Sequence, residues 1–165
     1  FRPTGKRSDT VKAHFEKTEY SPATTAAPSN PGLKATWHDF KGKTCSEIAA
    51  APVKKTYRVE DVTIPKGVKS FIIGLTYKGY INIPEDGIYS FYLSSDDGSM
   101  LYIDGKQVID NDGLHAPGEV TGQAALKQGY HPIEVQYFDH GGGSINLKVC
   151  DNNGKEMPFT YLYAH

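Results

Sequence analysis

Hydrophobic and polar residues alternate over short segments along most of the chain. The clearest alternation places Tyr89, Phe91 and Leu93 on one side of a predicted strand. The same two-residue period predicts further strands at residues 33–37, 57–64, 71–75, 80–83, 101–103, 133–137 and 145–149. No long segment has a helical period, and only residues 46–51, ended by Pro52, favour a helical turn. We therefore expect an all-β fold, an antiparallel sandwich or barrel with little helix.

Turn signals separate the predicted strands. Asp104 and Gly105 lie inside the run L-Y-I-D-G-K-Q-V-I and are typical of the positive φ angles of a type I′ hairpin. The sequence P-E-D-G at 84–87 predicts a turn before the strand that contains Tyr89. Residues 110–122 are mostly polar, and we expect them to form a long loop.

Composition divides the chain into unequal parts. The 165 residues fit one domain, with room for a fragment of a neighbour. Residues 21–32 read S-P-A-T-T-A-A-P-S-N-P-G, which is typical of a linker. We therefore expect residues 1–20 to be the remnant hairpin of a preceding module and residues 33–165 to form the sandwich.

Charge and cysteine usage exclude several classes of function. The formal net charge is −1 and no basic block occurs, so we expect no nucleic-acid partner. The longest apolar runs are far too short to span a membrane. Cys45 and Cys150 lack the C-x-x-C spacing of a zinc site. Whether they form one disulfide or remain two free thiols is left open by the sequence.

Two adjacent carboxylates occupy the loop between the two predicted strands of segment 88–104. Asp96 and Asp97 are followed by Gly98, in the run S-S-D-D-G-S. Paired carboxylates at the rim of a sheet are suited to a hard cation or a polar ligand. The same residues also suit a hairpin loop in which Asp and Gly serve the turn geometry alone.

The order of these motifs resembles a known family. The S-D-D-G-S loop, the I-D-G hairpin and the Y-F-x-x-G-G-G segment follow one another as in the protective-antigen-like domain, over residues 33–159. The resemblance implies a β-sandwich module of bacterial glycosidases, adhesins and toxins, which commonly binds sugars, in several members through calcium. The stretch F-R-P-T-G-K-R-S-D-T-V-K-A-H-F-E-K resembles the last hairpin of a fibronectin-like module that follows the catalytic barrel in chitobiase-like β-hexosaminidases.

The resemblance also implies a metal site. In sugar-binding members, a cis peptide joins the pair that matches Asp96 and Asp97, so that both carboxylates bind one calcium ion. The position of a further ligand matches Asp139, where the adhesins have Asn. Gly141 and Gly143 would add backbone oxygens, although this run of three glycines lacks the side chains with which adhesins contact sugars.

Two histidines lie near the expected ligand rim. We expect His140, beside Asp139, to contact a sugar. His115, in the polar loop, is a second candidate, with bracing of the loop as the alternative.

The leading hypothesis is a non-catalytic, calcium-dependent carbohydrate-binding module of a secreted glycoside hydrolase. Its partners would be a glycan and the adjacent domains of the same polypeptide, in a secreted, periplasmic or cell-surface location. One alternative is a structural spacer that packs against the catalytic domain and binds no ligand. The other alternative is an intrinsic glycosidase. The sequence contains carboxylates that could serve this chemistry, but it contains no catalytic motif.

Overall fold

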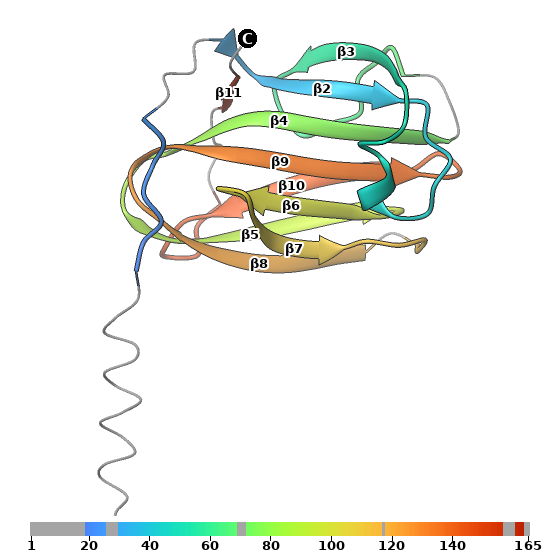
Figure 1. Ribbon diagram of the computed structural model, residues 1–165. Helices are drawn as coiled ribbons and strands as arrows, with labels where there is room; N and C mark the ends of the chain where they lie inside the picture. Colours follow the sequence, from blue (N-terminus) through green and yellow to red (C-terminus); the bar gives the residue numbers. More distant parts are fainter. Residues whose placement is uncertain (1–18, 26–29, 69–71, 117, 157–160, 164–165) are drawn as a thin grey trace, which may run out of the picture.

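The computed structural model describes residues 19–25, 30–68, 72–116, 118–156 and 161–163, and it consists almost entirely of antiparallel strands arranged in two packed sheets (Figure 1). The expected all-β sandwich is confirmed. The larger sheet has the strand order β1 (Asn30–Pro31), β11 (Tyr161–Tyr163), β4 (Ile73–Ile83), β9 (Gly129–Asp139), β6 (Ser99–Ile103) and β7 (Lys106–Asn111), while β2 (Leu33–His38) pairs with both β4 and β3 (Val53–Val59). The smaller sheet has the order β10 (Ser144–Cys150), β5 (Gly87–Asp96) and β8 (Gly118–Leu126).

The core lies between the two sheets, where every second residue of β5 is buried and β4, β9 and β10 also bury most of their inward-facing residues. Phe91 and Leu93 of β5 face Leu75 of β4 and Leu101 of β6 in one cluster, and none of these four side chains is exposed. The alternation that predicted the strands therefore marks the inward faces of the sandwich.

A second, smaller cluster lies on the outer face of the larger sheet. Residues 39–51 fold over one end of this face, and their short 3-10 helix η1 (Cys45–Glu47) is the teal turn in Figure 1. Phe40, Ile48 and Phe138 are buried together there. The predicted helical turn is thus present, but its helix begins one residue earlier than expected and ends at Glu47, well before Pro52.

Both cysteine thiols are free and buried, which answers the question that the sequence left open. Cys45 belongs to the outer cluster, and its thiol donates to the carbonyl of Gln136 at 3.7 Å. Burial, and then the carboxylate of Asp112, raise the pKa of this thiol far above its ordinary value. It therefore stays protonated and is inert as a nucleophile.

Three predicted boundaries are wrong. The segments expected at 71–75 and 80–83 are parts of one continuous strand, β4, although Phe71 lies outside the described residues. The strand expected at 57–64 is β3, which begins and ends earlier. The loop expected at 110–122 is much shorter, because β7 continues to Asn111 and β8 begins at Gly118.

Sequence analysis missed the strand β8 because two of its inward-facing positions carry small residues, Gly122 and Ala124. Gly122 packs so closely against β7 that an added Cβ would lie 2.3 Å from the carbonyl oxygen of Val108. Ala124 fills the next inward position beside the core. Such positions carry almost no hydrophobic signal, although they are required by the close approach of the two strands.

The hairpin between β6 and β7 has the turn that the sequence predicts. Asp104 has φ 55° and Gly105 has φ 76°, as a type I′ turn requires. The carboxylate of Asp104 also accepts a hydrogen bond from the buried ring of His131 at 3.0 Å. The turn is therefore tied to the neighbouring strand β9.

Part of the segment predicted as a linker, residues 21–32, lies against the sandwich. The amide of Ser21 donates to the carbonyl of Ala125 at 2.8 Å, and the Ser21 hydroxyl donates to Asp104. Strand β1 pairs with β11. The predicted remnant hairpin falls almost wholly within residues 1–18, which lie outside the described residues.

Within the part of the chain that the structure describes, no helix has the length and hydropathy that crossing a membrane requires.

We expect the replacement Leu93→Ala to lower the free energy of unfolding by about 2–5 kcal/mol, because it opens a cavity in the centre of the core. Val53→Ala is the matched control, since Val53 is 60% exposed, and it should cost less than about 1 kcal/mol. Urea denaturation measures both values. Equal losses would contradict the assignment of the core.

Candidate functional site

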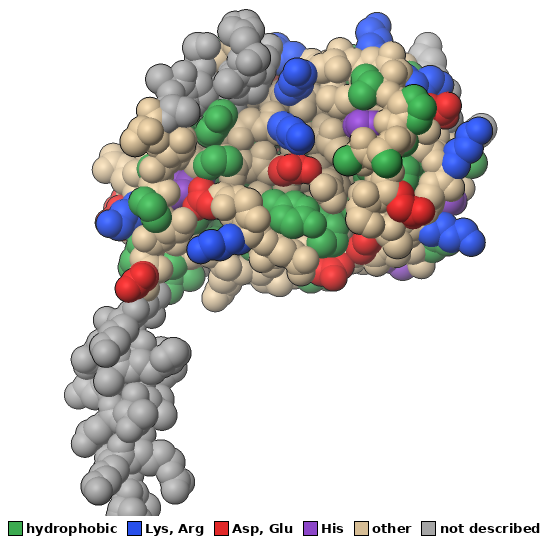
Figure 2. Space-filling model, in the orientation of Figure 1, with side chains coloured by type: hydrophobic (Ala, Val, Ile, Leu, Met, Phe, Trp, Pro, Cys, Tyr) green, Lys and Arg blue, Asp and Glu red, His purple; other side chains and the backbone are tan. Residues whose placement is uncertain are grey.

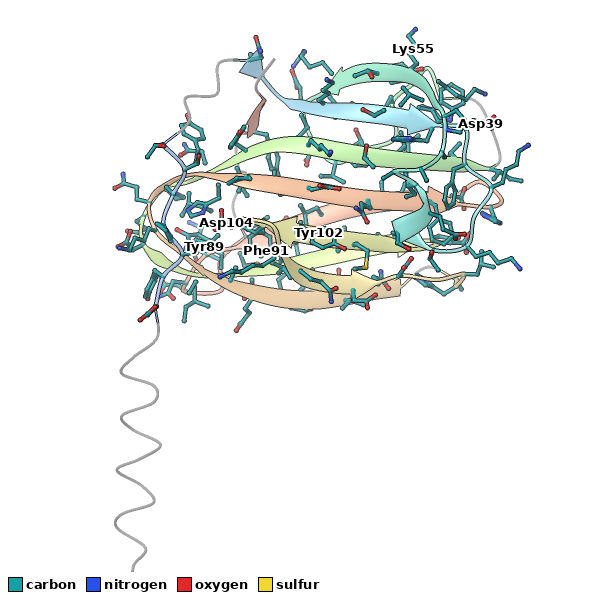
Figure 3. All side chains as sticks on the ribbon, in the orientation of Figure 1. Asp39, Lys55, Tyr89, Phe91, Tyr102 and Asp104 are labelled. Carbon is teal, nitrogen blue, oxygen red and sulfur yellow. The ribbon has the colours of Figure 1, made fainter. Side chains whose placement is uncertain are left out.

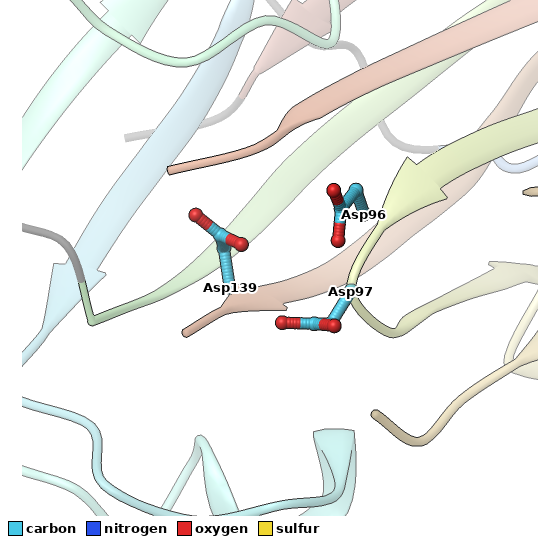
Figure 4. Close-up of side chains that lie close together, drawn as sticks. All are labelled: Asp96, Asp97 and Asp139. Carbon is cyan, nitrogen blue, oxygen red and sulfur yellow. The ribbon is translucent and has the colours of Figure 1, made fainter. Parts of the chain in front are cut away.

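Three carboxylates converge where strands of the two sheets end side by side. Asp96 ends β5 in the smaller sheet, Asp97 follows it, and Asp139 ends β9 in the larger sheet. One oxygen from each carboxylate lies within 4.8 Å of the others. Figure 4 shows the three side chains around a common space, and the site lies at the end of β9 that carries the arrowhead in Figure 1. The peptide bond between Asp96 and Asp97 is cis, as the resemblance implies.

The carboxylate of Asp97 joins two loops to this end of the sandwich. One of its oxygens accepts the backbone amide of His115 at 3.1 Å, and the other accepts the amide of His140 at 3.0 Å. Its own amide donates to the carbonyl of Phe138 at 3.1 Å. Asp97 therefore holds both the loop after β7 and the loop after β9 beside the carboxylate cluster.

Asp139 is the most buried of the three acids, with 2% of its surface exposed. Burial raises its pKa above the ordinary value, and the charges of Asp97 and Asp96 raise it further. Hydrogen bonds from the amides of Gly142 and Gly141 act in the opposite direction and favour the ionised form. The backbone of the glycine loop thus compensates part of the cost of an acid at this position.

The donor set fits calcium. Calcium binds carboxylate oxygens at about 2.3–2.6 Å, so two oxygens on one ion lie at most about 5 Å apart. The spacing within 4.8 Å meets this limit for all three acids. Hard oxygen ligands with no nitrogen or sulfur favour calcium, magnesium or manganese over softer transition metals such as zinc and copper. Asp96, Asp97 and Asp139 are therefore the residues that would hold such an ion.

A network of hydrogen bonds between buried polar side chains and the backbone carbonyls of the Asp pair supports that pair. The hydroxyl of Ser95 donates to the carbonyl of Asp97 at 2.8 Å and lies 2.6 Å from the hydroxyl of Ser99. The amide of Asn111 donates to Ser95 at 3.3 Å, and the hydroxyl of Tyr137 donates to the carbonyl of Asp96 at 2.8 Å. Sequence reasoning missed these residues. The available signal was that Ser95 and Ser99 are polar residues at inward-facing strand positions.

His115 braces its own loop. Its two ring nitrogens lie 2.7 Å and 2.9 Å from the carbonyl oxygens of Ala116 and Asn111. These two acceptors, Ala116 first, raise the pKa of the ring because a protonated imidazole can donate to both. A sugar contact from His115 stays a prediction, and it would compete with these bonds.

The ring of His140 also has partners within the protein. Its Nε2 donates to the carbonyl of Gly42 at 2.6 Å. The ring packs edge-on against Phe138, with 5.6 Å between ring centroids. These contacts attach the loop after β9 to residues 39–51, and the predicted sugar contact stays a prediction.

Two glycines at the site are required by close packing. A Cβ on Gly143 would lie 2.1 Å from the carbonyl oxygen of Asp96 and 2.8 Å from a carboxylate oxygen of Asp139. A Cβ on Gly98 would lie 2.4 Å from the ring of Phe138. Gly98 has no positive φ angle, so turn geometry does not explain this glycine.

Comparison with known proteins identifies the family. The family model described as PA14 domain matches residues 29–161. The chain belongs to the PA14 domain family. A solved "PA14 sugar-binding domain from RTX adhesin" superposes with a TM-score of 0.70 at 17% identity, covering 83% of this chain and 100% of that one. At this identity the likeness shows the fold alone.

Two curated relatives have names of carbohydrate-active enzymes. A beta-hexosaminidase of Porphyromonas gingivalis is 27% identical over 142 residues, which are 79% of this chain and 18% of that protein. An alpha-agarase of Thalassotalea agarivorans is 41% identical over 68 residues, which are 41% of this chain and 4% of that protein. The PA14 domain thus spans less than a fifth of each curated relative.

We expect Gly143→Ala to distort the carboxylate cluster, because the new Cβ meets backbone and carboxylate oxygens that lack room to move. Overpacking of this kind costs about 1–3 kcal/mol. Gly141→Ala is the matched control, because a Cβ there meets nothing within 4 Å. Thermal denaturation in the presence of chelator measures both variants, and identical midpoints would contradict the packing described here.

Proposed function

We propose that this PA14 domain is a non-catalytic carbohydrate-binding module of a secreted bacterial glycoside hydrolase, and that it binds sugar through calcium. The observation that supports this most directly is the convergence of Asp96, Asp97 and Asp139 within 4.8 Å. Three like charges at this spacing repel one another, and a divalent cation between them turns the repulsion into attraction.

The protein supplies only part of a calcium shell. Calcium takes six to eight oxygens, so three carboxylates and the backbone oxygens proposed for Gly141 and Gly143 leave positions for further ligands. The hydroxyl groups of a sugar are hard oxygen ligands of the required kind. Gly141 and Gly142 are exposed, so the loop leaves room for a ligand to approach. The ion when bound supplies Lewis-acid coordination of these hydroxyls, while the protein orients them.

The comparisons support the carbohydrate part of the proposal. The names of both curated relatives denote enzymes of carbohydrate chemistry, and the solved adhesin domain is named as sugar-binding. The activity of the whole polypeptide, its adjacent domains as partners, and a secreted, periplasmic or cell-surface location belong to the same proposal.

Calcium should raise the thermal midpoint of the domain, because an ion that binds only the folded state stabilises it. At a free concentration 100 times the dissociation constant the gain is about 2.7 kcal/mol. Asp97→Asn and Asp139→Asn should each abolish most of this gain. Glu60→Gln is the control, since Glu60 has an exposed side chain remote in sequence from the cluster, and it should keep the full gain. A midpoint unaffected by calcium would favour the spacer.

Sugar binding should require the ion. A glycan array probed with the isolated chain should give signals in calcium that disappear with chelator and in Asp97→Asn. Calcium binding without any glycan signal would leave the ion a structural role and refute the carbohydrate function. Turnover of chromogenic glycosides by the chain would instead favour the glycosidase.

A further inference from the structure

A groove crosses the outer face of the larger sheet, beside the part that residues 39–51 cover. Its volume is about 640 Å³, within the range of about 300–1,000 Å³ that is common for ligand sites. Figure 3 labels Tyr102 near the middle of this face, and Figure 2 shows the same face with an apolar patch among acidic and basic side chains. The lining residues include Lys34, Lys78, Tyr80, Tyr102, Glu134 and Gln136.

Strand register places four of these residues in one row across the sheet. Lys34 of β2 is opposite Lys78 of β4, Lys78 is opposite Glu134 of β9, and Glu134 is opposite Tyr102 of β6. Since neighbouring strands are about 4.8 Å apart, the row is about 14 Å long. Side chains on neighbouring strands in such a row present a continuous surface to one elongated ligand.

The two lysines repel each other, and the one carboxylate in their row, Glu134, lies opposite Lys78. The lysines are direct neighbours on adjacent strands, where like charges destabilise a sheet. Among the described residues, no carboxylate forms an ion pair with either of them. The carboxylate of Glu134 instead accepts a hydrogen bond from the amide of Gln136 at 2.8 Å. An anionic group on a ligand would relieve the repulsion between Lys34 and Lys78.

Tyr102 offers a fixed aromatic surface at the other end of the row. Its ring is half-buried and packs against the outer cluster that contains Phe40 and Phe138. Aromatic rings that are apolar on the face and polar at the tip are suited to the C–H faces of sugar rings. Glu134 and Gln136, beside it, provide an acceptor and an amide for hydroxyl groups.

We propose that this groove is a second saccharide-binding site, which takes an oligosaccharide that carries carboxylate or sulfate groups. Lys34 and Lys78 bind the anionic group, Tyr102 stacks on a sugar ring, and Glu134 and Gln136 contact its hydroxyls. Glu134 lies five residues before Asp139 on the same strand, so the two sites are about 16 Å apart. The groove therefore works without the carboxylate cluster and without calcium.

The experiment is titration calorimetry on the whole chain in the presence of chelator, which removes any contribution from the calcium site. The probes are oligogalacturonate, a sulfated galactan oligosaccharide and a neutral galacto-oligosaccharide of equal length. We expect saturable binding of at least one anionic probe, with at least about tenfold higher affinity than for the neutral one. The affinity should fall with added salt. The two anionic probes distinguish carboxylate from sulfate as the group that the lysines bind.

Variants locate the binding. The double variant Lys34→Gln, Lys78→Gln should lower the affinity for the anionic probe at least about tenfold. Lys148→Gln, which removes a lysine from the smaller sheet, is the matched control and should leave it unchanged. Tyr102→Ala should weaken binding, whereas Tyr102→Phe keeps the ring and should retain it. Thermal midpoints of all variants show whether they fold.

The proposal is overturned by absence of saturable binding to both anionic probes, by equal affinity for the neutral probe, or by binding that the lysine variants leave unchanged. Asp97→Asn separates the two sites, because it should leave this binding intact. Loss of binding in that variant would place the ligand at the carboxylate cluster and refute a second site. Failure here leaves the calcium proposal untouched, since every titration contains chelator.

Discussion

The carboxylate cluster depends on one constraint, which is the set of backbone hydrogen bonds that connects the two sheets at Asp97. The amide of Asp97 donates to the carbonyl of Phe138, and the amide of Phe138 donates to the carbonyl of Gly98. These bonds attach the segment between β5 and β6 to the end of β9. Because strands of different sheets are held together here, three acids that are distant in sequence occupy one small volume.

Holding three acids together has an electrostatic cost that the fold only partly offsets. Asp97 accepts hydrogen bonds from two backbone amides, and amides of the glycine loop stabilise the ionised form of Asp139. Among the described residues, however, no basic side chain forms an ion pair with any of the three acids. Buried like charges with incomplete compensation are more common at functional sites than in structural cores. The proposed calcium ion supplies the missing charge. The lysine pair on the outer face presents the same problem with opposite sign.

Local sequence patterns predicted most of the fold. Alternation located the strands around Tyr89, Leu101 and Val135, since one face of each is buried in an extended core. Asp104 and Gly105 predicted their turn correctly, because positive φ angles are a local property. Prediction failed at β8, where the close approach of β7 selects Gly122 over any larger inward residue. Packing between strands, which a local pattern does not record, determined that residue.

By itself the sequence determined the all-β class, the principal hairpin and, through the family resemblance, which acids belong together. The tertiary structure decided which other residues serve them. Ser95, Asn111 and Tyr137 support the Asp pair, and Gly143 is required by the carbonyl of Asp96. It also decided that Lys34 and Lys78 are neighbours, and that the two thiols are free. The physical reason is that these contacts join distant segments, so their geometry is defined only once the two sheets pack.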